Sequence, residues 1–306
     1  LIGTAYKASF ALAQTEESGH ELIVEEANWL RGAEWADSLG TDIISSSLGY
    51  STFDNTLHNH AYSDMNGKTT LVSKAAAWAA SKGILCTISA GNEGANAWKY
   101  ITAPADADSI VTVGAVNALG GLSSFSSIGP SFDGRIKPDV VALGSNAVVG
   151  LTDGTIGISS GTSFSAPLVA GLAAGLMQSF PSHSAQQIRS AILQSGSQFS
   201  RMDMLLGFGI PTFDKASSAM ELILGNSEEP TIRIYPNPVN PGDALHFSIP
   251  FKSTQVEMLN SSGIVVHTFY LAQSESTIYL GPFVSGKYYF RFTAESTSII
   301  KPVLLL

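Results

Sequence analysis

Helical and β-rich segments alternate between residues 24 and 88, and this alternation restricts the fold more than any other feature of the chain. Leu30, Ala33 and Ala36 recur at helical spacing, and Gly40 follows as a typical C-terminal stop. The expected elements, in order, are a helix over 24–39, a strand over 43–46, a helix over 69–82 and a strand over 84–88. This order is typical of a parallel β-sheet covered by helices, an α/β fold.

Two further strands are expected, over 9–13 and over 110–116. In an open parallel sheet, binding sites lie beyond the carboxyl ends of the strands. Ser47-Leu48-Gly49 and Asn92 each follow directly on an expected strand. We therefore expect both to contribute to one site.

The pattern of the sequence changes after a polar linker at 225–231. Short β-rich runs then follow one another, separated by Gly, Pro, Ser and Asn, at 232–235, 244–249, 255–259, 265–269, 277–280, 287–292 and 298–304. Such spacing predicts a small all-β, Ig-like sandwich. The expected domains are 1–224 and 232–306.

Composition excludes several classes of protein. The net charge of −9 provides no basic surface for nucleic acid. No apolar run is long enough for a transmembrane segment. Cys86 is the single cysteine and rules out a disulfide within the chain. It lies in an apolar strand, which indicates a small buried side chain and not a nucleophile.

Ser163 follows small residues and precedes an apolar helical pattern formed by Leu168, Leu172 and Leu176. In the first turn of a helix a serine is exposed, and its N–H can face a developing oxyanion. The alternative is a core helix with a serine or threonine cap. The segment Gly161-Thr162-Ser163-Phe164-Ser165-Ala166-Pro167 resembles the nucleophile motif of the subtilisin-like serine peptidases.

Two further segments strengthen this resemblance. Ser89-Ala90-Gly91-Asn92 resembles the oxyanion-hole segment of that family, and Ser47-Leu48-Gly49 resembles the edge segment that pairs with substrate backbone. The three motifs occur in the order of the family.

The resemblance implies a subtilisin-like serine endopeptidase that acts on polypeptides through an acyl-enzyme. It assigns Ser163 as nucleophile, Asn92 as oxyanion donor and Thr162 as a supporting residue. Ser47, Leu48, Gly49, Ser89, Ala90 and Gly91 would flank the substrate. Residues 102–104 are expected near the pocket for a substrate side chain, without a defined specificity.

The base and the orienting acid of a catalytic triad are not found in the sequence. The chain has six histidines, and none stands in the His-Gly-Thr context of the family: His20, His58, His60, His183, His246 and His267. His58 and His60 are expected on a solvated loop. We expect the Asp and His upstream of this chain, which alone would be inactive. The alternative is a catalytically inactive subtilase fold with a binding or structural role.

Ser159 offers a competing nucleophile, because Gly157-Ile158-Ser159-Ser160-Gly161 fits the G-x-S-x-G pattern. That pattern requires a helix directly after its serine. The helical pattern here starts only at Ser163, so Ser159 is expected in a strand.

No cofactor is expected for this chemistry. Subtilases often bind structural calcium, but Asp64-Met65-Asn66-Gly67 supplies only half of a loop-type site. A solvated turn is the preferred interpretation of this segment, and no metal ligand is assigned.

The C-terminal region resembles the type IX secretion C-terminal sorting domain. Its matching segments, in order, are Tyr235-Pro236-Asn237-Pro238-Val239, Asn260-Ser261-Ser262-Gly263, Ser285-Gly286-Lys287-Tyr288-Tyr289 and Lys301-Pro302-Val303-Leu304. The alternative is a generic Ig-like or carbohydrate-binding module. The resemblance implies recognition by the type IX secretion machinery and export across a Gram-negative outer membrane, to the cell surface or beyond it.

Overall fold

The structure, a computed structural model, describes residues 2–306 except 224–231, 241, 250–253, 282 and 295–296. The expected linker at 225–231 therefore lies outside the described residues. The chain forms two compact units, one from residues 1–34, 42–180 and 185–227, the other from 35–41, 181–184 and 228–306. Among the described helices, none is both long enough and apolar enough to cross a bilayer.

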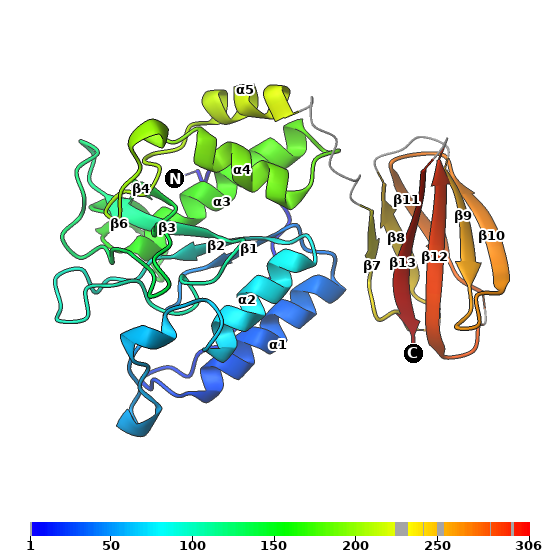
Figure 1. Ribbon diagram of the computed structural model, residues 1–306, viewed down its shortest axis with the longest axis horizontal. Coiled ribbons are helices and arrows are strands. Elements are labelled where there is room, and N and C mark those ends of the chain that lie inside the picture. Colours follow the sequence, from blue (N-terminus) through cyan, green and yellow to red (C-terminus); the bar gives the residue numbers. More distant parts are fainter. Residues whose placement is uncertain (1, 224–231, 241, 250–253, 282, 295–296) are drawn as a thin grey trace. The chain divides into compact units, whose positions relative to one another are not determined.

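The first unit is built on a four-stranded parallel sheet with the order β1-β2-β3-β4 (Figure 1). Its strands are β1 (Ile43–Ser46), β2 (Leu85–Ser89), β3 (Val111–Val116) and β4 (Val140–Leu143). Every residue of β2 and β3 is buried, as expected for strands covered on both faces. The predicted parallel sheet is confirmed.

Helices cover both faces of this sheet. Side chains of α1 (Val24–Ser38) and α2 (Leu71–Ser81) share one core with Cys86 and Ile88 of β2. Side chains of α3 (Thr162–Ser179), α4 (Ala185–Gln194) and α5 (Phe213–Ile223) share a second core with Leu85 of β2. Short 3₁₀ turns occur at Thr56–His58, Tyr62–Asp64 and Phe199–Arg201. Gly40 and Gly83 follow α1 and α2 with φ of 74° and 89°, which only glycine adopts easily.

One expected strand is absent. Residues 9–13 form no strand, and all five are exposed. A strand requires a hydrogen-bonded neighbour, and none of the described strands pairs with this segment. The helical pattern predicted from Leu168, Leu172 and Leu176 is helix α3, which buries Ala166, Val169 and Leu176 and leaves Leu168 36% exposed.

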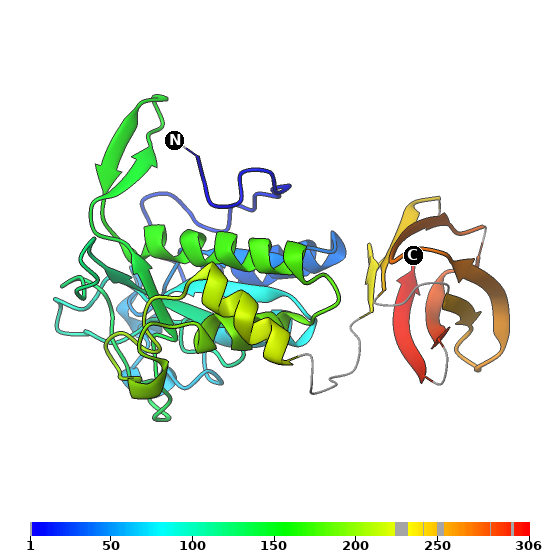
Figure 2. The same ribbon diagram turned by 90° about the horizontal axis from the view of Figure 1, so that it is seen from above.

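A β-hairpin that the sequence analysis did not predict joins β4 to α3. Its antiparallel strands β5 (Ala147–Gly150) and β6 (Ile156–Ser159) project from the body of the unit (Figure 2). The hairpin is closed at its base, where the Gly161 N–H donates to the Gly144 carbonyl at 2.9 Å. The chain thus returns to the carboxyl end of β4, and α3 begins there.

The second unit consists of two antiparallel sheets with the orders β10-β9-β12-β13 and β11-β8-β7. The strands are β7 (Arg233–Tyr235), β8 (Ala244–Ser248), β9 (Thr254–Leu259), β10 (Val265–Leu271), β11 (Glu275–Tyr279), β12 (Gly286–Ala294) and β13 (Thr297–Leu305). Phe247 of one sheet meets Phe290 and Phe292 of the other in a shared core. The predicted all-β unit is confirmed, whereas its Ig-like topology stays a prediction.

The Pro-Asn-Pro segment has a defined structural role in this second unit. Asn237 Nδ2 donates to the Pro302 carbonyl at 3.2 Å, and its Oδ1 accepts from the Leu304 N–H at 2.9 Å. The Val239 N–H also donates to the Leu304 carbonyl. These bonds satisfy backbone groups along the outer edge of β13 and protect that edge from pairing with another chain.

A buried ion-pair network ties the sheet of the first unit to α4. Lys137 Nζ lies 2.7 Å from Asp139 Oδ2, and Arg189 Nη2 lies 3.3 Å from Asp139 Oδ1. The side chains of Lys137 and Asp139 are only 3% and 6% exposed. Burial alone would raise the pKa of Asp139, but the two cations outweigh it and hold this pKa below its usual value of 3.8.

We expect Asp139→Asn to destabilise the first unit by about 3–5 kcal/mol, because the buried Lys137, whose pKa burial lowers, would have to lose its proton or stay charged without its partner. Asp133→Asn is the matched control: its partner Arg135 and Asp133 itself are 29% and 36% exposed. Such a pair contributes up to about 1 kcal/mol. Urea unfolding of both variants measures the difference, and equal losses would contradict the expectation.

The same network predicts a pH dependence. Because the folded pKa of Asp139 is lowered, its contribution to stability is present above the unfolded pKa and is lost as pH falls through the folded one. Wild-type stability should therefore decline below about pH 4, and Asp139→Asn should show a shallower decline over that range.

Candidate active site

The predicted site residues converge at the carboxyl edge of the parallel sheet. The segment Ser47-Leu48-Gly49 continues from β1, and Ala90-Gly91-Asn92 continues from β2. The N-terminal end of α3 meets both segments through hydrogen bonds. Two strands and one helix thus bring together residues that are more than a hundred positions apart in the sequence.

The side chain of Asn92 is fixed by Thr162. The Asn92 Oδ1 atom accepts from the Thr162 N–H at 2.9 Å and from the Thr162 hydroxyl at 3.0 Å. With its oxygen occupied, the amide must direct its Nδ2 group elsewhere. Within the described residues Nδ2 has no acceptor, and Asn92 is exposed. The amide is thus an oriented donor that is free to bind a ligand oxygen.

Ser163 is the second residue of α3 and is half-buried. At this position its backbone N–H has no intrahelical acceptor, and the helix dipole is positive. The Ser47 hydroxyl donates to the Ser163 backbone carbonyl at 3.0 Å, which connects the first turn of α3 to the segment after β1. The predicted place of Ser163 in the first helical turn is confirmed.

A third segment lies between the two predicted substrate segments. The Thr102 N–H donates to the Ala90 carbonyl at 3.2 Å. Ala103 and Tyr50 exchange two backbone hydrogen bonds, at 2.7 and 3.1 Å. Residues 102–103 therefore bridge the segments that contain Gly49 and Gly91. Of the remaining predicted residues, Ser89 is buried at the end of β2 and Leu48 packs against the first core.

Ser159 is placed apart from this arrangement. It is the last residue of β6 and pairs with Ala147 in the hairpin. Gly161, the N-cap position, separates it from the start of α3 at Thr162. The expectation that Ser159 lies in a strand is confirmed.

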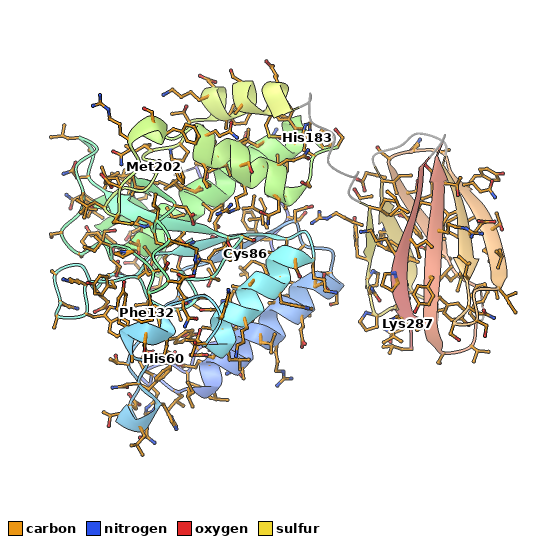
Figure 3. All side chains as sticks on the ribbon, viewed as in Figure 1. His60, Cys86, Phe132, His183, Met202 and Lys287 are labelled. Carbon is orange, nitrogen blue, oxygen red and sulfur yellow. The ribbon has the colours of Figure 1, made fainter. Side chains whose placement is uncertain are left out.

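Two histidines of the first unit pair with carboxylates. His60 was expected to be solvated, and this is wrong: its side chain is 13% exposed, and it pairs with the buried Glu26. The sequence around His60 does not predict this pairing, because Glu26 precedes His60 by 34 residues. Figure 3 shows His60 beyond the sheet, beside α1 and α2. His20 is 64% exposed and pairs with Asp54. Among the described residues, no histidine hydrogen-bonds to Ser163.

Cys86 is fully buried between the sheet and α2 (Figure 3), and burial raises the pKa of its thiol to about 12. A thiol with this pKa is not a nucleophile at neutral pH. The expected buried, structural role of Cys86 is confirmed.

Side-chain oxygens of the Asp64–Gly67 segment accept hydrogen bonds from neighbouring backbone groups. Asp64 Oδ2 accepts from the Ala61 N–H, and Asn66 Oδ1 accepts from the Lys68 N–H, each at 2.8 Å. The described residues contain no group of three or more His, Cys, Asp or Glu side chains arranged to hold a metal ion.

Comparison with known families agrees with this geometry. The sequence model of the subtilase family matches residues 1–209. The chain belongs to the subtilase family. It is 33% identical to subtilisin NAT of Bacillus subtilis subsp. natto over 195 residues, 63% of this chain and 45% of that protein. It is 35% identical to the subtilisin of Bacillus pumilus over 167 residues, 54% of this chain and 53% of that protein. This subtilase chain thus spans about half of the length of the curated relatives that it matches.

Solved structures show the same fold for the subtilase unit. The prenylagaramide maturation protease PagA matches with a TM-score of 0.52 and 23% identity, over 64% of this chain and 67% of that chain. The self-cleaved protease domain of PatA matches with a TM-score of 0.51 and 25% identity, over 66% of this chain and 69% of that chain.

The second unit also belongs to a known family. Residues 233–305 match the secretion system C-terminal sorting domain. This domain directs a protein through the type IX secretion system to the cell surface or to the outside of the cell. This match confirms the resemblance to a sorting domain that the sequence of the second unit indicated.

Two features of the site were not recognised in the sequence. Thr162 was expected to support the site, but the bonds from its N–H and its hydroxyl to Asn92 join residues 70 positions apart. Thr102 was placed near a substrate pocket without a role. The sequence feature that could have indicated the place of Thr102 is the pair Gly49 and Gly91, because each lacks a side chain where Thr102 packs.

Proposed function

We propose that the protein is a secreted serine endopeptidase that hydrolyses peptide bonds through an acyl-enzyme intermediate. One observation carries this proposal: Thr162 orients the Asn92 amide beside Ser163, at the N-terminal end of α3. Acyl transfer requires a nucleophile and N–H donors around one position, and in this proposal Ser163 and the Asn92 amide supply them.

In the proposed reaction Ser163 Oγ attacks the carbonyl carbon of the substrate, and its proton passes to a general base. The carbonyl oxygen becomes an oxyanion and accepts from Asn92 Nδ2 and from the Ser163 N–H. Collapse of the tetrahedral intermediate expels the amine, which takes the proton from the base. Water then releases the acyl group from Ser163. These steps require no metal ion or redox cofactor.

The substrate would bind as an extended strand between Ser47-Leu48-Gly49 and Ser89-Ala90-Gly91. Ser47-Leu48-Gly49 continues from β1, the edge strand of the sheet, and an added strand can pair with such an edge. The Ala90 and Gly91 carbonyls are already bonded within the protein, so Ser89-Ala90-Gly91 would contact the peptide mainly by packing. Small residues on both sides allow close approach of the peptide backbone. The substrates are therefore polypeptides with an accessible, unfolded stretch.

We propose that the general base and the acid that orients it come from a part of the protein outside these 306 residues. Among the described residues Ser163 has no histidine partner, and His20 and His60 are paired with Asp54 and Glu26. The matched region covers 45% of the length of subtilisin NAT and 53% of the length of the subtilisin of Bacillus pumilus. The rest of each relative is not matched by this chain.

This proposal predicts a difference between the chain and the full-length gene product. Residues 1–306 alone should neither cleave casein nor react with a fluorophosphonate probe, because Ser163 lacks a base. The full-length protein should do both, and its Ser163→Ala variant should lose the label.

Two other results of this experiment would contradict different parts of the proposal. Labelling of residues 1–306 at the rate of the full-length protein would show that a base within this chain had been overlooked. A full-length protein that neither reacts nor cleaves would contradict the peptidase proposal. It would favour an inactive subtilase fold that acts as a surface binding protein.

A further inference from the structure

The backbone carbonyl of Ser163 lacks its usual donor within α3. In an α-helix a carbonyl accepts from the N–H four residues later. The residue four positions after Ser163 is Pro167, which lies inside the helix. Proline has no N–H, and its ring crowds the carbonyl of the residue four positions before it. The sequence therefore deprives the predicted nucleophile of a helical hydrogen bond.

The Ser47 hydroxyl supplies a donor to this carbonyl. Ser47 Oγ lies 3.0 Å from the Ser163 carbonyl oxygen, and 116 positions separate the two residues in the sequence. Ser47 directly follows β1, the edge strand of the parallel sheet. The bond therefore ties the first turn of α3 to the sheet at the residue that is expected to react.

Ser163 is held on both sides by hydrogen bonds. On its N-terminal side Thr162 donates to Asn92 from its N–H and from its hydroxyl. On its C-terminal side the Ser163 carbonyl accepts from Ser47. The N–H and the Oγ of Ser163 lie between these two anchors. Both anchors thus restrict the backbone torsions that orient the two groups.

We propose that Ser47 is a positioning residue for the nucleophile. Its hydroxyl replaces the donor that Pro167 lacks and holds Ser163 in the orientation from which Oγ attacks. This inference rests on the proposed peptidase function. The Ser47 side chain then acts through the Ser163 carbonyl, whereas the family resemblance assigns the segment of Ser47 to substrate binding. The effect is on rate, because a small misplacement of a reacting group is costly in catalysis.

The proposal requires coupling between Ser47 and Pro167. Ser47→Ala removes the hydroxyl donor and leaves the backbone of the edge segment in place. Pro167→Ala restores an N–H four residues after Ser163, and this N–H can donate to the same carbonyl. The loss caused by Ser47→Ala should therefore be smaller in the Pro167→Ala background. A side chain that acts independently of this carbonyl would cause the same loss in both backgrounds.

The experiment uses the full-length protein and measures kcat and KM for a peptide substrate, with active-site titration, and the rate of fluorophosphonate labelling. Ser47→Ala should lower kcat and the labelling rate by about three- to tenfold, the range of one neutral hydrogen bond. Its KM should stay within about twofold of wild type, since the substrate segment is intact. Ser47→Thr retains a hydroxyl and should retain most of both rates. In the Pro167→Ala background, Ser47→Ala should change kcat by less than about twofold.

Ser81→Ala is the matched control. The Ser81 hydroxyl also donates to a backbone carbonyl, that of Trp78, at 2.6 Å. Ser81 is exposed at the C-terminal end of α2. Its replacement should leave kcat, KM and the labelling rate at the values of the wild type.

Three results would overturn the role of Ser47 and leave the peptidase proposal intact. The first is a Ser47→Ala variant with wild-type kcat and labelling rate. The second is a raised KM with both rates unchanged, which would show that the Ser47 side chain contacts the substrate. The third is an equal loss of kcat in the two Pro167 backgrounds. A wild-type full-length protein that neither cleaves peptides nor reacts with fluorophosphonate would overturn both proposals.

Discussion

Replacement of Ser163 by Ala in the full-length protein is expected to lower turnover by about 10⁶, a factor known for the nucleophile of a subtilisin and carried over to this relative. The reason is that the variant lacks the hydroxyl that would form the acyl-enzyme. The Asn92 amide and the substrate segments would remain, so residual activity above the uncatalysed rate is expected. Steady-state turnover of a peptide substrate, with active-site titration, measures the loss.

Ser159→Ala is the matched control for this experiment. Ser159 lies in the G-x-S-x-G pattern at 157–161, but it ends strand β6 and pairs with Ala147. We expect its replacement to leave turnover within about twofold of wild type, since a surface substitution outside the site changes little. A large loss in Ser159→Ala with an active Ser163→Ala would reverse the assignment of the nucleophile.

The second large effect concerns the oxyanion. Asn92→Ala in the full-length protein should lower turnover by about 10²–10³ with little change in KM, again a magnitude taken from a subtilisin. The amide would bind an oxygen that carries full negative charge only in the transition state, so its loss affects kcat and not substrate binding. Thr162 holds this amide in place with two hydrogen bonds, so its donor is oriented before the substrate arrives.

Asn96→Ala provides the control within the same loop. Asn96 is an exposed asparagine whose Nδ2 donates to Glu93 at 2.6 Å, and among the described residues no hydrogen bond joins its side chain to α3. Its replacement should leave both kcat and KM near the values of the wild type. If Asn92→Ala raises KM and leaves kcat unchanged, the amide binds the ground state of the substrate and is not an oxyanion donor.

The periodicity of the sequence determined the layers of the first unit. The helical spacing of Leu30, Ala33 and Ala36 and the apolar run before Asn92 were sufficient to predict α1 and β2, because burial on one or two faces imposes a repeat on the side chains. The β-rich runs beyond residue 231 predicted the second unit for the same reason. The failure at residues 9–13 shows the limit: β-propensity does not supply a partner strand.

The sequence also located Ser163 at the start of a helix and Asn92 after a strand, since small residues and turn residues are local signals. Only the tertiary structure decided what these residues contact. The bond from Thr162 to Asn92, the burial of His60 against Glu26, and the place of Thr102 between Gly49 and Gly91 each join positions far apart in the chain. Such contacts depend on how the layers pack, and packing between distant segments leaves no periodic pattern along a single sequence.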